Sequence, residues 1–151
     1  MEEPRFNFGV VDNRFLARSL GLLNPPPAIT ILDESSIEEA IKLFQQHRIG
    51  ALAVTDIKGK LTGIFTERDV VLKVCLSDIK IAAAPISELM TCNPQTAQMT
   101  TTMSFALNMM TQGGYRNIPI VDETGFPLAM VSVKDVVDYL VHALTKDLGG
   151  V

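Results

Sequence analysis

Two short stretches of the chain combine a hydroxyl, a carboxylate and the start of a helix in the same order. Thr66 follows an apolar run at 61–65 that predicts a strand, and Asp69 lies where an apolar helical pattern begins. Ser132 and Asp135 repeat this arrangement 66 positions downstream. A hydroxyl and free N–H groups at a helix start can hold a phosphate, and a short carboxylate can accept two hydrogen bonds from a ribose cis-diol. The spacing therefore points to a nucleoside phosphate.

The same spacing fits a simpler structure, the capping box [ST]-x-x-[DE], in which hydroxyl and acid satisfy the first N–H groups of a helix. Taken singly, each match favours an ordinary cap. Repetition at the same place, and Asp where Glu or Gln is more usual, favour a ligand. Both interpretations stay open on the spacing alone.

We call these two stretches the joints, Thr66 to Asp69 in the first half of the chain and Ser132 to Asp135 in the second. The similarity at this offset of 66 positions extends well beyond them. Sliding the second half back over the first by this offset brings like residues together over about forty positions without a gap, which is typical of internal duplication. One unit of about 50 residues would bury little core alone, so the two are expected to pack by their apolar sheet faces. The matched pairs are Thr96 on Thr30, Ala106 on Ala40, Met110 on Phe44, Asp122 on Asp56 and Gly125 on Gly59.

The pattern predicts an α+β fold of two tandem β-α-β-β-α repeats. In the first repeat, strands are expected at 29–32, 51–55 and 61–65, with helices at 37–49 and 66–75. Ser35 and Glu38 fit a capping box, and Gly50 is the expected helix stop. The predicted division is a lead-in helix or arm (1–23), repeat 1 (24–80), a linker (81–94), repeat 2 (95–145) and a tail (146–151).

Two shorter helices are expected outside the repeats. Ser87 is expected to cap a turn at 86–90, and Asn13 to cap a short lead-in helix. That lead-in helix either packs on the body of the domain or forms a dimer arm. Its apolar face would consist of Phe15, Leu16, Leu20 and Leu23.

Composition narrows the function classes. A net charge of −4 and a pI near 5.1 argue against a nucleic-acid or anionic-membrane surface. No apolar run is long enough to span a membrane, and the start lacks a signal-peptide pattern. Cys75 and Cys92 form no CxxC pair, which with the other features predicts a reduced, cytoplasmic protein. His47 and His142 have no neighbours at metal or nucleophile spacing, so neither a metal site nor an enzyme is expected.

Three stretches then resemble one known family. The joint at 63–69, the approach to the second strand at 47–54 and its counterpart at 115–122 are similar to a CBS domain, the module named after cystathionine beta-synthase. The resemblance covers about 24–144. It implies a pair of domains, or Bateman module, with pseudo-two-fold symmetry, which regulates other activities by binding adenine nucleotides between the repeats.

The resemblance implies two clefts, each drawing on both repeats. In the first, Ser132 would hold phosphate, Asp135 the ribose and Met130 the base, with Arg116 facing the phosphate. Its remaining residues would be Ile29, Ile49 and Gly50. The second cleft would consist of Ile64, Thr66, Asp69, Gln95, Tyr115 and Arg116.

The two clefts are not equal in this sequence. Gly50 stands in repeat 1 where repeat 2 has Arg116, so the cleft of Ser132 and Asp135 is ranked first. Arg48 or Arg68 are candidates to replace the missing arginine. In the simpler alternatives, Arg116 is an ordinary surface residue and Tyr115 belongs to the core.

Two function classes follow. The first is a sensor for AMP, ADP or ATP without a covalent cofactor, with S-adenosylmethionine or NAD as alternative ligands. The second is a ligand-free dimerisation or protein-interaction module, for which the family implies homodimers formed through helices. Either class can act on a separate effector protein. The candidate dimer surface, which could equally fill the core, is the set Val70, Val71, Val74, Val136, Val137, Leu140 and Val141.

Overall fold

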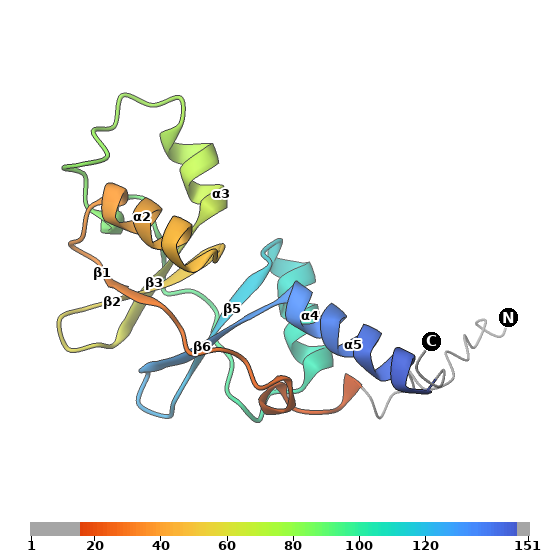
Figure 1. The fold of residues 1–151 in the computed structure, drawn as a ribbon. Helices are drawn as coiled ribbons and strands as arrows, with labels where there is room; N and C mark the ends of the chain where they lie inside the picture. The colour runs from red at the N-terminus through yellow and green to blue at the C-terminus, as the bar shows by residue number, and fades with distance from the viewer. Residues whose placement is uncertain (1–15, 148–151) are drawn as a thin grey trace, which may run out of the picture.

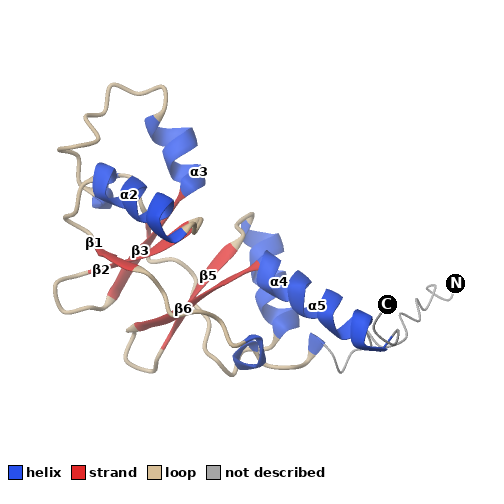
Figure 2. Ribbon diagram, in the orientation of Figure 1, coloured by secondary structure: helices blue, strands red, loops and turns tan. Residues whose placement is uncertain are grey.

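The computed structural model describes residues 16–147, in which two α+β units, as predicted, lie side by side (Figures 1 and 2). The first unit follows the predicted order, and its second helix widens to a π-helix after one turn. Its elements are β1 (Thr30–Leu32), α2 (Ile37–His47), β2 (Ala51–Thr55), β3 (Leu61–Thr66), α3 (Glu67–Asp69) and the π-helix η2 (Val70–Val74).

The second unit repeats the first with the predicted offset. Its elements are α4 (Met103–Gly113), β5 (Asn117–Val121), β6 (Pro127–Ser132) and α5 (Val133–Asp147). The bounds of α4, β5 and β6 each follow those of α2, β2 and β3 by the same offset that separates the two joints. This agreement confirms the internal duplication. Between the units lie the short helix η3 (Ile86–Glu88) and the strand β4 (Thr91–Cys92).

The sheets of the two units share one plan, but the second is less complete. The first sheet has the order β1-β2-β3-β4, with β1 parallel to β2 and the other pairs antiparallel. The second consists of β5 and β6 with a single bridge at each edge, from Ala97 to Ile120 and from Pro27 to Ala129. The second bridge lies in the triple-proline stretch, which lacks the N–H groups that a full strand needs.

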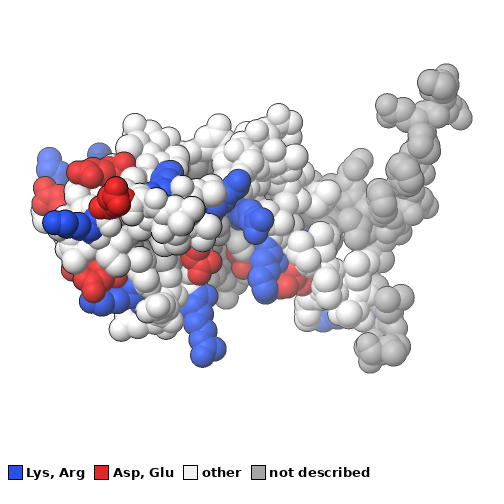
Figure 3. All heavy atoms as spheres, turned by 90° about the horizontal axis from the view of Figure 1, so that it is seen from above, with Lys and Arg blue, Asp and Glu red and all other residues white. Residues whose placement is uncertain are grey.

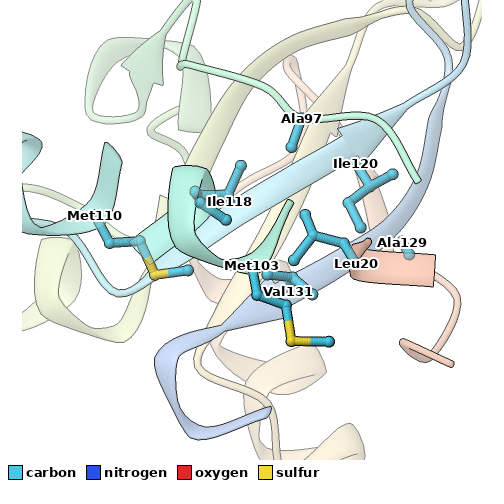
Figure 4. Close-up of a cluster of buried hydrophobic side chains, with 9 residues drawn as sticks. Leu20, Ala97, Met103, Met110, Ile118, Ile120, Ala129 and Val131 are labelled. Carbon is cyan, nitrogen blue, oxygen red and sulfur yellow. The ribbon is translucent and has the colours of Figure 1, made fainter. Parts of the chain in front are cut away.

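Each hydrophobic core is closed by the segment that precedes the other repeat. Ile86, from the segment between the repeats, is fully buried in the first core with Ile37, Phe44 and Phe65. Leu20, from the short helix η1 (Leu20–Leu23) before repeat 1, is fully buried in the second core. Figure 4 shows Leu20 among Met103, Ile120 and Val131. The two repeats therefore complete each other.

The arrangement of the helices leaves the two hairpins in contact. Helices α2 and α3 lie on one side of the first sheet, and α4 and α5 run together beside the second (Figure 1). The turns at the tips of the hairpins meet where the Leu61 amide donates to the Gly125 carbonyl over 3.1 Å. Phe126 also packs over Gly59, which needs its positive φ of 86° for the turn.

The start and end of α2 differ from the prediction. Ser36, not Ser35, is the N-cap, and it forms the capping box with Glu39 rather than Glu38. This register puts Ile37, Ala40 and Phe44 into the core, whereas the amide and carbonyl of Ser35 are used in a turn and in a bond to Ile86. The helix ends at His47 and is capped by Arg48 in the left-handed conformation, two residues before Gly50, the expected stop.

The short helices outside the repeats also differ. The N-cap of η3 is Pro85 and not Ser87. Ser87 lies within the helical turn, where its amide donates to the Asp33 carbonyl. A continuous lead-in helix through Leu20 is wrong, because Ser19 is extended and pairs with Thr102. The expected cap Asn13 and the expected contact residue Phe15 lie outside the described residues.

Candidate functional site

The joint in repeat 1 is a complete capping box between β3 and α3. The Thr66 hydroxyl accepts a bond from the Asp69 amide at 3.2 Å. In return, Oδ2 of Asp69 accepts from the Thr66 amide and from its hydroxyl, both at 2.9 Å. The predicted cap is therefore formed.

The joint in repeat 2 has the same bonds. The Ser132 hydroxyl accepts from the Asp135 amide at 3.2 Å. Oδ2 of Asp135 accepts from the Ser132 amide at 2.7 Å and from the hydroxyl at 2.8 Å. The two predicted pairs of hydroxyl and carboxylate thus have the same geometry, and each carboxylate is still partly exposed.

The second oxygen of each carboxylate distinguishes the joints. Oδ1 of Asp69 lies 2.7 Å from the Lys73 ammonium, one helical turn further along. Among the described residues, no group donates to Oδ1 of Asp135. The position of Lys73 is filled in α5 by Tyr139, whose hydroxyl accepts a bond from Arg18. Sequence reasoning missed Lys73, although its spacing of four residues from an acid on a helix is a known signal for an ion pair.

The residue before each second strand also differs between the repeats. The carbonyl groups of Gly50 and Arg116 play the same part, accepting from the Glu67 amide at 3.1 Å and the Val133 amide at 3.0 Å. The Glu67 carboxylate lies against Gly50, 3.4 Å from the place where a Cβ would be. The joint in repeat 2 thus has an exposed arginine where the joint in repeat 1 has a glycine beside an acid. At this position the repeat 2 joint therefore carries a positive charge, whereas the repeat 1 joint is neutral and lies beside a negative charge.

The structure brings the repeat 1 joint close to residues of repeat 2. Arg68, between Thr66 and Asp69, donates through Nη1 to the Gly114 carbonyl at 3.3 Å. Next to Gly114, the Tyr115 hydroxyl donates to Oε1 of Gln95 at 2.5 Å, and burial raises the pKa of Tyr115. Two predicted residues of the second cleft, Tyr115 and Gln95, are thus hydrogen-bonded to each other, next to the carbonyl that Arg68 contacts. Arg68, a candidate for the missing arginine, is held there and not at Gly50.

The first cleft is less clearly assembled. Ile29 and Ile49 pack against the first core. Among residues 16–147, no hydrogen bond or ion pair joins Ile29, Ile49 or Gly50 to Ser132 or Asp135. Beside Ile29, the Ala28 amide donates to the Leu128 carbonyl on β6 at 3.2 Å, which is one of the links between the repeats.

The predicted base contacts differ in exposure. Ile64 is only 7% exposed, whereas Met130, at the same place on β6, is partly exposed and available for a flat ring. A hollow of about 280 Å³ lies elsewhere, over Ile31 and α2, and contains none of the predicted site residues. This hollow therefore does not correspond to either predicted cleft.

The described part of the chain lacks two other features. It contains no cluster of three or more His, Cys, Asp or Glu side chains arranged to hold a metal ion. Within the same residues, no helix has the length and hydropathy needed to cross a membrane.

The sequence of the chain matches the model of a known protein family. The model of the CBS domain family matches the chain twice, at residues 22–75 and 86–142. This protein belongs to the CBS domain family. The two matches correspond to the two structural repeats, so the chain is a CBS pair.

Relatives agree with this assignment. CBS domain-containing protein CBSCBSPB5 of Arabidopsis thaliana is 34% identical over 133 residues, which cover 88% of this chain but 24% of the plant protein. The CBS-domain protein ATU1752 of Agrobacterium tumefaciens has a solved structure that is 32% identical, with a TM-score of 0.73 over 82% of this chain and 93% of that one. The chain thus spans about a quarter of the plant relative and nearly all of the bacterial structure.

A further solved relative contains ligands. The CBS domain pair of protein MJ0100 was solved in complex with 5′-methylthioadenosine and S-adenosyl-L-methionine. It is 26% identical, with a TM-score of 0.74, and the match covers 82% of this chain and 96% of that one.

Proposed function

We propose that this CBS pair is a regulatory module that binds an adenosine-containing ligand, AMP, ADP or ATP, chiefly at the joint of Ser132 and Asp135. The observation that carries the proposal is the Asp135 carboxylate, which uses one oxygen for the helix cap and leaves the other without a donor among the described residues. A ribose cis-diol offers two donors to such an oxygen.

The surroundings of this joint support a phosphorylated nucleoside. Arg116 lies one residue before β5, beside the start of α5, where it can neutralise a phosphate. Met130 on β6 can cover the base. The complex of the MJ0100 pair with two adenosine compounds supports the same ligand class and keeps S-adenosylmethionine, along with NAD, as an alternative.

The proposed action is allosteric regulation of a separate effector protein in the cytoplasm, without catalysis by the module itself. The carboxylates of both joints serve as caps and recognition groups. Neither has the adjacent base that an activated nucleophile needs.

Isothermal titration of the whole chain with AMP tests the proposal. Asp135→Asn keeps one side-chain oxygen for the cap but replaces the other oxygen with an NH2 group, which cannot accept from the ribose. We therefore expect AMP to bind roughly 10- to 100-fold more weakly. Asp138→Asn is the matched control, because Asp138 lies on the same helix and is bonded only to Lys134 among the described residues. Equal affinity of wild type and Asp135→Asn for AMP, ATP and S-adenosylmethionine would remove the basis of the proposal.

A second function, homodimerisation, is favoured by one surface. Val137, Val141 and Leu144 lie on one face of α5 and are 46%, 53% and 38% exposed, whereas Val136 is fully buried. The candidate stripe is thus divided between core and surface, and the same holds in repeat 1, where Val71 is exposed and Val74 buried. Burying the exposed face against a second copy would remove apolar surface from water.

Light scattering at micromolar concentration tests dimerisation. We expect twice the chain mass of 16.5 kDa for wild type and a single mass for Val137→Glu combined with Val141→Glu. Ile57→Glu, on the exposed hairpin turn, is the control that stays dimeric. A monomeric wild type would exclude this function without affecting ligand binding.

A further inference from the structure

The acceptor capacity of the two carboxylates is not the same. An ionised carboxylate has about four acceptor positions, two on each oxygen. In Asp69 the two bonds from Thr66 and the Lys73 ammonium occupy three of them, which leaves one. In Asp135 the two bonds from Ser132 leave two. A ribose cis-diol needs two, so only Asp135 can accept both hydroxyls as the protein stands.

Lys73 is held firmly in this position. Its ammonium lies 2.7 Å from Oδ1 of Asp69 and donates to the Leu89 carbonyl at 2.6 Å. The Asp69 side chain is only 13% exposed, so the ion pair is less screened by water than a surface pair. The helix is widened at this point, with the Cys75 amide bonded five residues back to Val70 at 3.1 Å. Such π-turns often occur at functional sites.

We infer that Lys73 is an internal competitor for the ribose at the repeat 1 joint, so that the module fills the joint of Ser132 and Asp135 first. This inference rests on the proposed function. Binding at Asp69 requires that Lys73 moves away, which also frees the Leu89 carbonyl in the segment between the repeats. Ligand binding at the Asp69 joint thereby alters the connection between the repeats, whereas binding at the Asp135 joint does not.

Adenosine is the sharper probe, because it carries the ribose without a phosphate that would itself attract Lys73. Titrations compare the whole chain as wild type, as Asp135→Asn, and as Asp135→Asn with Lys73→Met. In the Asp135→Asn background only the repeat 1 joint remains, and there we expect Lys73→Met to strengthen adenosine binding about five- to tenfold, as for loss of one partly exposed ion pair with its hydrogen bond. Lys42→Met is the matched control, because Lys42 pairs with Glu38 four residues before it on α2.

The outcomes separate the inference from the proposed function. If wild type binds one equivalent of adenosine or AMP, and Lys73→Met strengthens binding in the Asp135→Asn background, both stand. If wild type binds two equivalents of equal affinity, or if Lys73→Met changes binding no more than Lys42→Met does, the competitor role is wrong and the proposed function survives. If neither wild type nor any variant binds either probe, both are wrong.

Discussion

In repeat 1 the Asp69 carboxylate lies between its capping bonds and the ammonium of Lys73, whereas in repeat 2 the Asp135 carboxylate has only capping bonds among residues 16–147. The capping bonds themselves are nearly equal in length, 2.9 to 3.2 Å at Thr66 and 2.7 to 3.2 Å at Ser132. The residues inside these two capping boxes are alike, and so are the bonds that they form. The residues around the box differ between the repeats, and under the proposed function these neighbours decide whether a joint can accept a ligand.

The distribution of charge shows the same contrast on a larger scale. Helix α2 carries acids and a lysine on its outer face, whereas its counterpart α4 has no charged residue. In Figure 3 the charged side chains gather over the repeat 1 side of the view, with both signs interspersed. The two repeats therefore share a backbone but present different surfaces to ligands and partners.

Closure of the two cores is where the repeats are most alike. The Leu20 amide donates to the Thr101 carbonyl at 2.8 Å, and the Ile86 amide donates to the equivalent Ser35 carbonyl at 2.9 Å. Both side chains are fully buried. We expect Leu20→Ala and Ile86→Ala each to lower the free energy of unfolding by about 2–5 kcal/mol, the usual cost of such a cavity, measured by urea denaturation.

The form of these transitions tests the equivalence of the repeats. Because each closing segment belongs in sequence to the other repeat, a single cooperative transition is expected for both variants. Leu22→Ala is the control, since Leu22 is 57% exposed in the same short helix and its loss is expected to cost less than about 0.5 kcal/mol. If Ile86→Ala lowered the free energy of unfolding strongly and Leu20→Ala hardly at all, repeat 2 would not need its closing segment.

Much of the fold could be predicted because the duplication provides an internal check. A strand or helix assigned in one repeat is tested by the equivalent sequence in the other. The bounds of β2 and β3 agree closely with the prediction, and β5 and β6 follow them by the same offset. The exchange of closing segments was not predicted, although the duplication carries a signal for it. The prolines before Ala28 and the stretch around Pro85 indicate linkers. Sliding one repeat over the other by the same offset nevertheless brings Leu20 onto Ile86 and Leu23 onto Leu89, which marks the two segments as equivalent.

Local competition explains the misplaced caps. Ser35 with Glu38 and Ser36 with Glu39 fit the capping box equally well in sequence. Tertiary packing decides between them by burying Ile37, Ala40 and Phe44. At the other end of α2, Arg48 takes a left-handed conformation that Gly50 could adopt at less cost, because β2 must begin at Ala51.

The chemistry of the site was predictable at the joints and not around them. The spacing of Thr66 from Asp69 and of Ser132 from Asp135 fixes the capping bonds, because all the atoms involved lie within one helical turn. The placement of Arg68 on the Gly114 carbonyl and of Tyr115 on Gln95 depends on how the two repeats pack. No local pattern contains that information.

The smallest expected effect concerns the hairpin turns. Asp122 accepts bonds from the Thr124 hydroxyl at 2.8 Å and from the Phe126 amide at 3.0 Å, and these hold its pKa below the ordinary value. At the equivalent turn, the only donors to the Asp56 side chain in the described part of the chain are the amides of Lys58 and Lys60. We expect Thr124→Val to raise the pKa of Asp122 in a carbon-detected NMR titration, and Thr124→Ser, which keeps the hydroxyl, to leave it low.

The lowered pKa also fixes how this turn depends on pH. A carboxyl whose pKa is lower in the folded state adds stability above its unfolded pKa, near 4, and loses it as the pH falls through the folded value. The stability difference between wild type and Thr124→Val should therefore be largest at neutral pH and shrink in strong acid. A difference that stays constant from neutral to acid pH would assign the effect to the threonine methyl or to turn propensity, and the two hairpins would then differ in packing rather than in charge.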